Sequence, residues 1–201
     1  MKNISKKVNS ELSTVTITYN NELGLQKTLE SLLRADCKPF EIIIIDGGSE
    51  DNTIEIINKY KELLPQINFS SKSDEGIYDA LNIGKRKVKT KLVHYLNAGD
   101  EIFGNPYDNL DNPCLLRVEF VDSEGLFCGT DKVKLFGTAY NHQGVIVNSS
   151  HYEFDLNFDL AADYKMLLQE FPEGLNSLRI SDNGGVRYLL GGISSQKSLK
   201  G

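Results

Sequence analysis

The chain has 201 residues and a formal net charge of −6, with 22 Lys and Arg against 28 Asp and Glu. This length and composition fit one ordinary globular domain, and the acidic balance without a dense basic face argues against a protein that binds duplex nucleic acid. The three cysteines, Cys37, Cys114 and Cys128, are far apart and form no C-x-x-C pair, which argues against a disulfide framework or a structural zinc site and favours a reducing cytosol.

Strands and helices are predicted to alternate through the first hundred residues. Residues 1–12 are polar, lack the apolar core of a secretory signal and are expected to form a flexible leader. After them the pattern predicts strands at 15–18, 40–45, 67–69 and 92–96, separated by amphipathic helices at 25–33, 54–64 and 77–88. Such alternation implies right-handed crossovers and a parallel sheet, and the unbroken apolar run at 40–45 indicates a strand covered on both faces.

The second half of the chain has a less regular pattern. Residues 105–113 are rich in Asn, Asp and Pro and predict a loop, and residues 196–201 are expected to be a flexible tail. Short strands are predicted at 115–120, 133–136, 144–147 and 178–180, with a helix at 160–168. The sequence has no run of 18 apolar residues that would predict a membrane span.

Polar turns follow three of the predicted strands, at 19–20, 46–49 and 97–100, and should share the carboxyl edge of the sheet, where such folds bind ligands. Asp46 can accept hydrogen bonds from a ribose or a base, or it can serve only its own turn and the next helix. Asp100 offers a hard oxygen ligand for Mg²⁺ or Mn²⁺. The sequence contains neither G-x-G-x-x-G nor a P-loop motif, so a dinucleotide site and a P-loop site are both unsupported.

Taken in order, six segments carry a resemblance to a known family. They are TVTITYNN (14–21), FEIIIIDGGSEDNT (40–53), SDEGIYDALNIGKRKV (73–88), LVHYLNAGDEIF (92–103), NHQGVIV (141–147) and FDLAADYKMLLQ (158–169). The chain resembles the family 2 glycosyltransferases of the GT-A fold, bacterial enzymes that build polysaccharides and O-antigens. The resemblance implies one α/β GT-A domain at 13–195, with a mostly parallel central sheet flanked by helices. Its nucleotide-sugar half would be 13–103 and its acceptor half 104–195.

The resemblance also implies a set of site residues. The donor-binding candidates are Thr18, Tyr19, Asn20, Glu22, Asp46, Gly48, Ser49, Asp74, Asp79, Asn82 and Asn97. The Asn97–Asp100 turn stands in for the acidic D-x-D turn, but Asn97 and Gly99 occupy its acidic positions, which leaves Asp100 as the metal ligand. Asp163 matches the catalytic base, and His142 could face the acceptor or approach the metal.

The implied activity is an inverting, Mn²⁺- or Mg²⁺-dependent sugar transfer in surface polysaccharide synthesis. The donor would be a nucleotide-sugar, in particular a UDP-sugar, and the acceptor a lipid-linked compound or an oligosaccharide. No nucleic-acid partner is expected, and the location would be cytoplasmic with peripheral contact at the inner face of the membrane. The basic stretch Lys85–Lys91 fits either such contact or a solvated helix end. The alternatives are a nucleotidyltransferase and a catalytically inactive glycosyltransferase-like binding protein.

Overall fold

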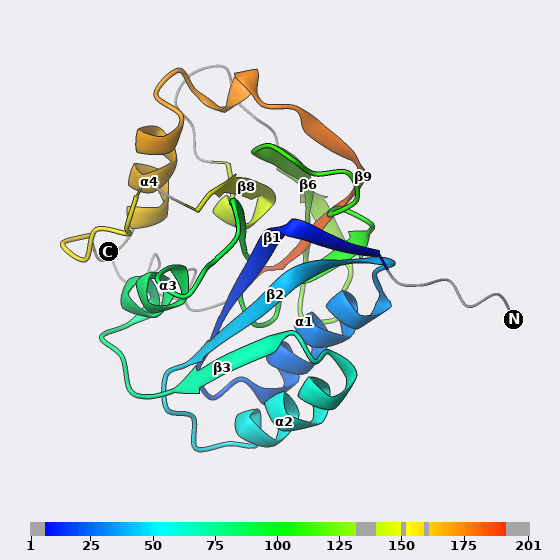
Figure 1. Cartoon of the computed structure of the whole chain (residues 1–201), viewed down its shortest axis with the longest axis vertical. Coiled ribbons are helices and arrows are strands. Elements are labelled where there is room, and N and C mark those ends of the chain that lie inside the picture. Colours follow the sequence, from blue (N-terminus) through cyan, green and yellow to red (C-terminus); the bar gives the residue numbers. More distant parts are fainter. Residues whose placement is uncertain (1–6, 132–139, 150–151, 159–160, 192–201) are drawn as a thin grey trace, which may run out of the picture.

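The computed structural model describes residues 7–131, 140–149, 152–158 and 161–191, and nine strands within them form one sheet (Figure 1). Strands β1 (Lys7–Thr18), β2 (Cys37–Asp46), β3 (Ile67–Ser71) and β4 (Leu92–Tyr95) pair in parallel in the order β3-β2-β1-β4. The sheet continues with β8 (Val145–Asn148), β6 (Cys114–Val121), β9 (Ile180–Leu189) and β5 (Glu101–Gly104), while β7 (Phe127–Thr130) pairs with β6. The parallel sheet predicted for the first half is therefore confirmed. In the second half, β6 and β9 are parallel and the other pairs are antiparallel.

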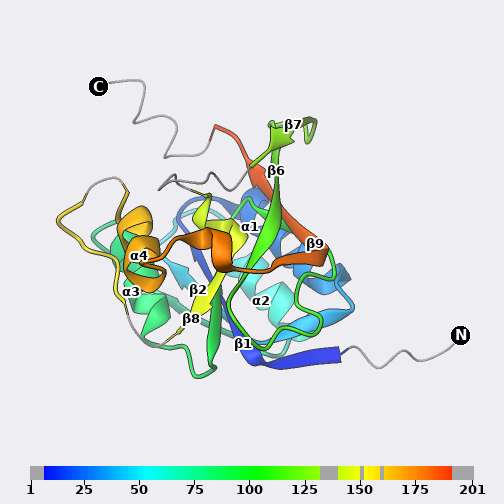
Figure 2. The same ribbon diagram turned by 90° about the horizontal axis from the view of Figure 1, so that it is seen from above.

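Helices cover both faces of the sheet. They are α1 (Glu22–Arg34), α2 (Thr53–Leu63), α3 (Ile77–Lys85) and α4 (Ala162–Glu170). The structure also contains two short 3₁₀ helices, η1 (His142–Gly144) and η2 (Leu175–Ser177). Ile42 and Ile44 of β2 pack in the core with α1 and α2, whereas Ile43 and Ile45 pack in the core with α3 and α4. Figure 2 shows α3 and α4 together on one side of the strands and α1 and α2 on the other. The apolar run at 40–45 is thus covered on both faces, as predicted.

The first strand begins at Lys7, inside the stretch predicted to be a flexible leader. Lys7 pairs with Cys37 of β2 and forms an ion pair with Asp108. The Asn9 side chain donates hydrogen bonds to the carbonyls of Tyr107 and Leu110, at 2.9 Å each. These contacts with the 107–110 loop hold the strand in place, and the prediction was wrong for residues 7–12 because a polar strand of this kind has no apolar period. Residues 1–6 and the predicted tail at 196–201 lie outside the described residues.

The largest difference from the sequence prediction is β9, a ten-residue strand where only 178–180 was predicted. Its segment SDNGG (181–185) has the composition of a turn. Glycine is required at 184 and 185 because the backbone of neighbouring segments leaves no space for a Cβ. A Cβ on Gly184 would lie 2.1 Å from the carbonyl oxygen of Phe103, and one on Gly185 would lie 2.1 Å from that of Arg117. Strands β5 and β7 were also not predicted, and the predicted strand 133–136 lies outside the described residues. Among the described helices, none is both long and apolar enough to cross a lipid bilayer.

Candidate active site

The three polar turns meet at the carboxyl edge of the parallel strands, as predicted. Asn20 has a left-handed backbone with φ 45° and connects two of the turns. Its amide donates to Ser49 Oγ at 2.7 Å, and its side-chain oxygen accepts from the amide of Glu50 at 2.8 Å. The Asn21 side chain reaches the third turn through the carbonyl of Ala98, at 3.1 Å. Asn20 and Ser49 therefore fix the shape of this edge.

The Asp46 carboxylate is fully buried and serves its own turn. One oxygen accepts from the amides of Gly48 and Ser49 at 3.2 and 3.0 Å and from the Ser71 hydroxyl at 2.6 Å, and the other accepts from the Ser49 hydroxyl. Gly48 has φ +85°, a conformation that suits glycine and closes the turn. These contacts fit the turn alternative for Asp46 and leave its carboxylate no exposed atom for a ribose or a base.

Three further candidates hold the protein's own backbone or are buried. Glu22 accepts from the amide and the side chain of Asn52 at 2.9 and 2.6 Å, which fixes the start of α2. The Asn82 side chain both donates to and accepts from the backbone of Phe154, at 2.8 Å each. Thr18 is buried, and its hydroxyl finds no partner within the described part of the chain. The structure thus gives Glu22 and Asn82 contacts within the protein, and their contacts with a nucleotide stay predictions.

Tyr19 and Asp74 remain open to a ligand and face each other across Gly47. The Tyr19 side chain is 58% exposed. A Cβ on Gly47 would lie 3.0 Å from Asp74 Oδ2 and 3.3 Å from the Tyr19 ring. Asp74 also accepts from the amide of Gly76 at 2.9 Å, and Asp79 accepts from the amide of Glu75 at 3.2 Å, so both aspartates shape the loop before α3. An aromatic face, a glycine and a carboxylate therefore lie side by side at the sheet edge.

The turn at Asn97–Asp100 is anchored by Thr28 of α1, which sequence reasoning did not single out. Its hydroxyl donates to the carbonyl of Asp100 at 2.7 Å and accepts from the amide of Gly99 at 3.0 Å. The side-chain oxygen of Asn97 is buried, and no described residue gives it a hydrogen bond. A buried oxygen without a donor is costly unless a ligand supplies one, so Asn97 stays a candidate for contact with a ligand.

Asp100 is turned into the protein, away from any ligand at the edge. It is 5% exposed, and its Oδ1 accepts from the amide of Leu189 in β9 at 3.0 Å. Burial raises its pKa to about 7, against the lowering effect of hydrogen bonds from Leu189 and from the Gln143 side chain. A carboxylate that closes a strand end in this way is not placed to coordinate an ion.

The predicted metal site does not fit the residues that the structure describes. Within these residues, no three His, Cys, Asp or Glu side chains gather closely enough to hold a metal ion. The single carboxylate of the 97–100 turn is occupied by Leu189 and Gln143. Mg²⁺ is usually held by one or two protein carboxylates, with substrate phosphates and water as its other ligands, so the orientation of this one carboxylate decides whether the turn can hold an ion. The inward orientation of the Asp100 carboxylate therefore argues against its assignment as a metal ligand.

The buried Asp100 makes a testable prediction about pH. With its pKa near 7, the folded protein holds this proton up to about pH 7, whereas a free aspartate releases it near its ordinary pKa of 3.8. The folded state therefore binds more protons across this interval, and the free energy of unfolding should fall as the pH rises from 4 to 7, by about 4 kcal/mol at most. Asp100→Asn, which can still accept from Leu189, should lose this part of the pH dependence in urea unfolding curves.

A difference between Asp100→Asn and wild type that does not change with pH would contradict the burial of this carboxylate. Titration of UDP with and without Mn²⁺ supplies an independent test of whether Asp100 is a metal ligand. If Asp100 were a metal ligand, Asp100→Asn would abolish any effect of Mn²⁺ on the affinity for UDP. We expect the substitution to leave that effect as it is in wild type.

A carboxylate, an imidazole and a phenol from three elements meet beside this edge. Asp163 lies in the first turn of α4, after Ala161, whose φ of 68° is unusual for a residue other than glycine. His142 Nδ1 lies 2.8 Å from one Asp163 oxygen, and the Tyr78 hydroxyl donates to the other at 3.2 Å. Because β8 runs antiparallel to β4 and η1 precedes it, His142 lies at the carboxyl end of β4. The structure thus brings together Asp163 and His142, which the sequence singled out, and adds Tyr78, which it did not.

The Asp163 carboxyl group stays ionised in this surrounding. Burial alone would raise its pKa, but the hydrogen bond and charge of His142, the amide of Tyr164 and the Tyr78 hydroxyl hold the pKa at about 2. Burial and the neighbouring carboxylate raise the pKa of Tyr78 to about 12, so the phenol remains a donor. The arrangement can therefore orient an imidazole and stabilise its positive charge.

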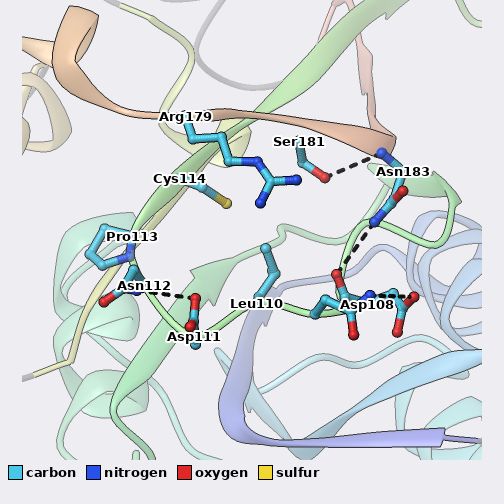
Figure 3. Close-up of a pocket in the computed structure, with 10 residues that line it drawn as sticks. Asp108, Leu110, Asp111, Asn112, Pro113, Cys114, Arg179, Ser181 and Asn183 are labelled. Carbon is cyan, nitrogen blue, oxygen red and sulfur yellow. Dashed lines mark hydrogen bonds between the residues drawn. The ribbon is translucent and has the colours of Figure 1, made fainter.

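A separate pocket lies at the opposite, amino-terminal end of β6 and β9 (Figure 3). The 108–113 loop forms one wall, and Arg179, Ser181 and Asn183 form the other. The Asn183 amide donates to Ser181 Oγ at 3.4 Å, and its side chain donates to the carbonyl of Asp108 at 3.5 Å. None of the predicted site residues lines it, so the pocket is separate from the candidate active site.

Comparison with known proteins supports the resemblance found in the sequence. Residues 13–105 match the family model described as Glycosyl transferase family 2. An uncharacterized glycosyltransferase of Escherichia coli K12, YibD, is 32% identical over 101 residues, which are 50% of this chain and 29% of that protein. A PGL/p-HBAD biosynthesis glycosyltransferase of Mycobacterium bovis BCG is 32% identical over 92 residues, which are 45% of this chain and 36% of that protein. The matched segments therefore span about a third of the length of these relatives.

The fold is that of a solved GT-A protein. Residues 1–349 of Staphylococcus aureus TarS, in complex with UDP, superpose with a TM-score of 0.72 at 18% identity, over 90% of this chain and 60% of that one. At this identity the likeness establishes the fold alone. The predicted α/β GT-A architecture is confirmed by it.

Proposed function

We propose that this chain, which carries a family 2 glycosyltransferase segment at residues 13–105, moves a sugar from a nucleotide-sugar to an acceptor hydroxyl. The observation that carries the proposal is the Asp163–His142 pair beside the carboxyl edge of the parallel strands, 2.8 Å between Oδ2 and Nδ1. A sugar transferase needs a proton acceptor next to the anomeric carbon of the donor. The same proposal includes the predicted division of the chain into a leader, a GT-A domain at 13–195 and a tail at 196–201. Residues 7–12 are excepted from the leader, because they form part of β1.

The donor would lie along the sheet edge, with its base against the exposed face of Tyr19. The 58% exposed Tyr19 offers a stacking face, and Asp74 offers a carboxylate next to it, beside Gly47. This assigns to Asp74 the role that the sequence gave to Asp46. UDP is the diphosphate bound by the TarS neighbour of the same fold, and on that ground we favour a UDP-sugar.

The proposed reaction is a single displacement with inversion at the anomeric carbon. The Asp163–His142 pair takes the proton of the acceptor hydroxyl while the oxygen attacks, and the C–O bond to the diphosphate breaks, so that the nucleoside diphosphate leaves with the bonding electrons. Asn97 lies on the third turn of this edge, and its side-chain oxygen is buried without a partner among the described residues. That oxygen can accept a hydrogen bond from a hydroxyl group of the donor sugar.

The acceptor and location remain part of the proposal. We place the enzyme in the cytoplasm, acting on a lipid-linked compound or an oligosaccharide for a surface polysaccharide. Contact with the membrane through Lys85–Lys91 is limited by ion pairs: Arg86 approaches Glu153 at 3.6 Å and Lys89 approaches Glu41 at 3.8 Å. These pairs favour the solvated helix end over a membrane-binding patch.

The proposal is tested by binding and turnover. UDP, GDP and ADP are titrated by calorimetry with Mn²⁺ and with EDTA, and UDP release is followed from UDP-glucose, UDP-galactose and UDP-GlcNAc. Binding of none of the three diphosphates would overturn the donor assignment. Binding of UDP without release from any sugar would favour the inactive binding protein, and pyrophosphate release from a nucleoside triphosphate would favour the nucleotidyltransferase.

Tyr19 supplies a direct prediction about the donor. Tyr19→Ala removes the stacking face and should weaken UDP binding about 10-fold or more, since stacking of a base on an aromatic ring contributes about 1–3 kcal/mol. The matched control is Phe127→Ala, another exposed ring, 64% accessible and on β7. Calorimetry that gives both variants the wild-type affinity would show that the base lies elsewhere.

A further inference from the structure

His142 has one ring nitrogen bound and one without a partner. Nδ1 lies 2.8 Å from Asp163 Oδ2, whereas Nε2 is buried and bonds to no residue in the described ranges. The side chain is 13% exposed and that of Asp163 is 28% exposed. A buried ring nitrogen without a partner is unfavourable in a folded protein, and such groups gather where a ligand completes the bond.

Both oxygens of Asp163 are already engaged. Oδ2 faces His142 and Oδ1 accepts from Tyr78. The amide of Tyr164 adds a further hydrogen bond, and the group has its pKa held at about 2. This pKa includes the effect of a positive charge on His142, so the role of Asp163 is assigned from its two hydrogen bonds. A carboxylate engaged in this way is well suited to hold an imidazole in one orientation.

The η1 turn that carries His142 is fixed on its other side. His94 of β4 is wholly buried, and its ring nitrogens bond to the carbonyl of Gln143 at 2.6 Å and to the Tyr107 hydroxyl at 2.8 Å. Burial lowers the pKa of His94 to about 4, so no second positive charge forms beneath His142. The titratable groups that act on His142 are thus Asp163 from α4, Tyr78 through Asp163 from α3, and the neutral His94 from β4.

We propose that Nε2 of His142 is the atom that takes the proton of the acceptor hydroxyl, and that Asp163 and Tyr78 are positioning residues that act through His142. The inference rests on the proposed sugar transfer. Asp163 keeps the Nδ1–H tautomer, which leaves the Nε2 lone pair free. The hydroxyl proton moves to Nε2, the oxygen bonds to the anomeric carbon, and the diphosphate leaves with the electrons of the broken bond. Asp163 balances the positive charge of the imidazolium until the proton on Nε2 passes to water.

The test separates the two candidate atoms with amide variants. His142→Asn keeps a donor near the position of Nδ1 for Asp163 but lacks Nε2, whereas His142→Gln places an amide near Nε2. The matched control is Asp155→Asn, because Asp155 also precedes the body of α4 and is ion-paired, with Lys165. The release of UDP that accompanies transfer of the sugar to water or to an acceptor is measured with whichever UDP-sugar the wild type turns over. Circular dichroism checks that each variant is folded.

We expect His142→Asn to lower kcat at least about 100-fold, the scale of a lost general base, with KM for the donor unchanged. His142→Asn/Asp163→Asn should lose no more than the larger single loss, and added imidazole should restore part of the activity of a folded His142→Ala.

Two results would count against this inference in different ways. A His142→Asn enzyme with more than a tenth of wild-type kcat would place the proton on Asp163 and overturn the inference alone. A wild-type protein that releases UDP from none of the sugars would overturn the proposed function and this inference with it.

Discussion

Asp163→Asn should lower sugar transfer by about 10²–10⁴-fold while leaving UDP binding within twofold of wild type. The substitution keeps the shape of the side chain but removes the charge that holds His142 through a 2.8 Å contact. Without that charge, the imidazole loses both its fixed tautomer and the stabilisation of its positive form. The donor should still bind, because Tyr19 and the Gly47 turn lie on other elements, at the ends of β1 and β2.

The measurement pairs turnover with calorimetry on the same preparations. Asp155→Asn serves as control, since hydrogen bonds from Lys165 and Asn157 also hold the pKa of Asp155 at about 2, and it contacts neither His142 nor Tyr78 in the described structure. Wild-type turnover in Asp163→Asn would remove Asp163 from the reaction, both as base and as positioning residue. A parallel loss in Asp155→Asn would show that general damage to the α4 region explains the effect.

The first half of the fold was predictable because one physical signal repeats along it. Apolar residues recur with helical spacing between continuous apolar strands, and β2 shows why the signal is strong: alternate isoleucines fill two separate cores. The second half lacks that signal. Strand β9 contains SDNGG, where the need for glycine comes from the backbone of Phe103 and Arg117, residues far away in the sequence.

The sequence predicted where the candidate site lies, but it predicted the roles of the site residues only in part. Sequence spacing puts acidic and polar residues at the strand ends, but it does not say where a side chain points. Asp46 turns into its own loop and Asp100 turns toward β9, whereas Asp74 lies beside Gly47 and Tyr19. The link between His142 and Asp163 spans 21 residues and depends on how η1 packs against α4. Tyr78 lies between two acidic candidates, and only the packing of α3 beside α4 reveals its contact.

Gly185→Ala should strongly destabilise the sheet. The new Cβ would lie 2.1 Å from the carbonyl oxygen of Arg117 and 2.8 Å from the Phe103 ring. Backbone on one side and an aromatic ring on the other leave the methyl group no space, so β9 must move away from β6. We expect a loss of about 3 kcal/mol or more in the free energy of unfolding, measured by urea denaturation.

The control is Gly125→Ala, at a position with φ +80° and nothing within 4 Å of the added Cβ. It should cost only the strain of a left-handed alanine, about 1–2 kcal/mol. Displacement of β9 should also reach the active site, because Leu189 of this strand donates the 3.0 Å hydrogen bond to Asp100 that closes the 97–100 turn. Gly185→Ala should therefore weaken UDP binding even at temperatures where the protein is folded, whereas Gly125→Ala should not. Equal stability of the two variants would mean that β9 does not pack against β6 as closely as the structure shows. The inferred coupling of β9 to the 97–100 turn through Asp100 would then lose its support.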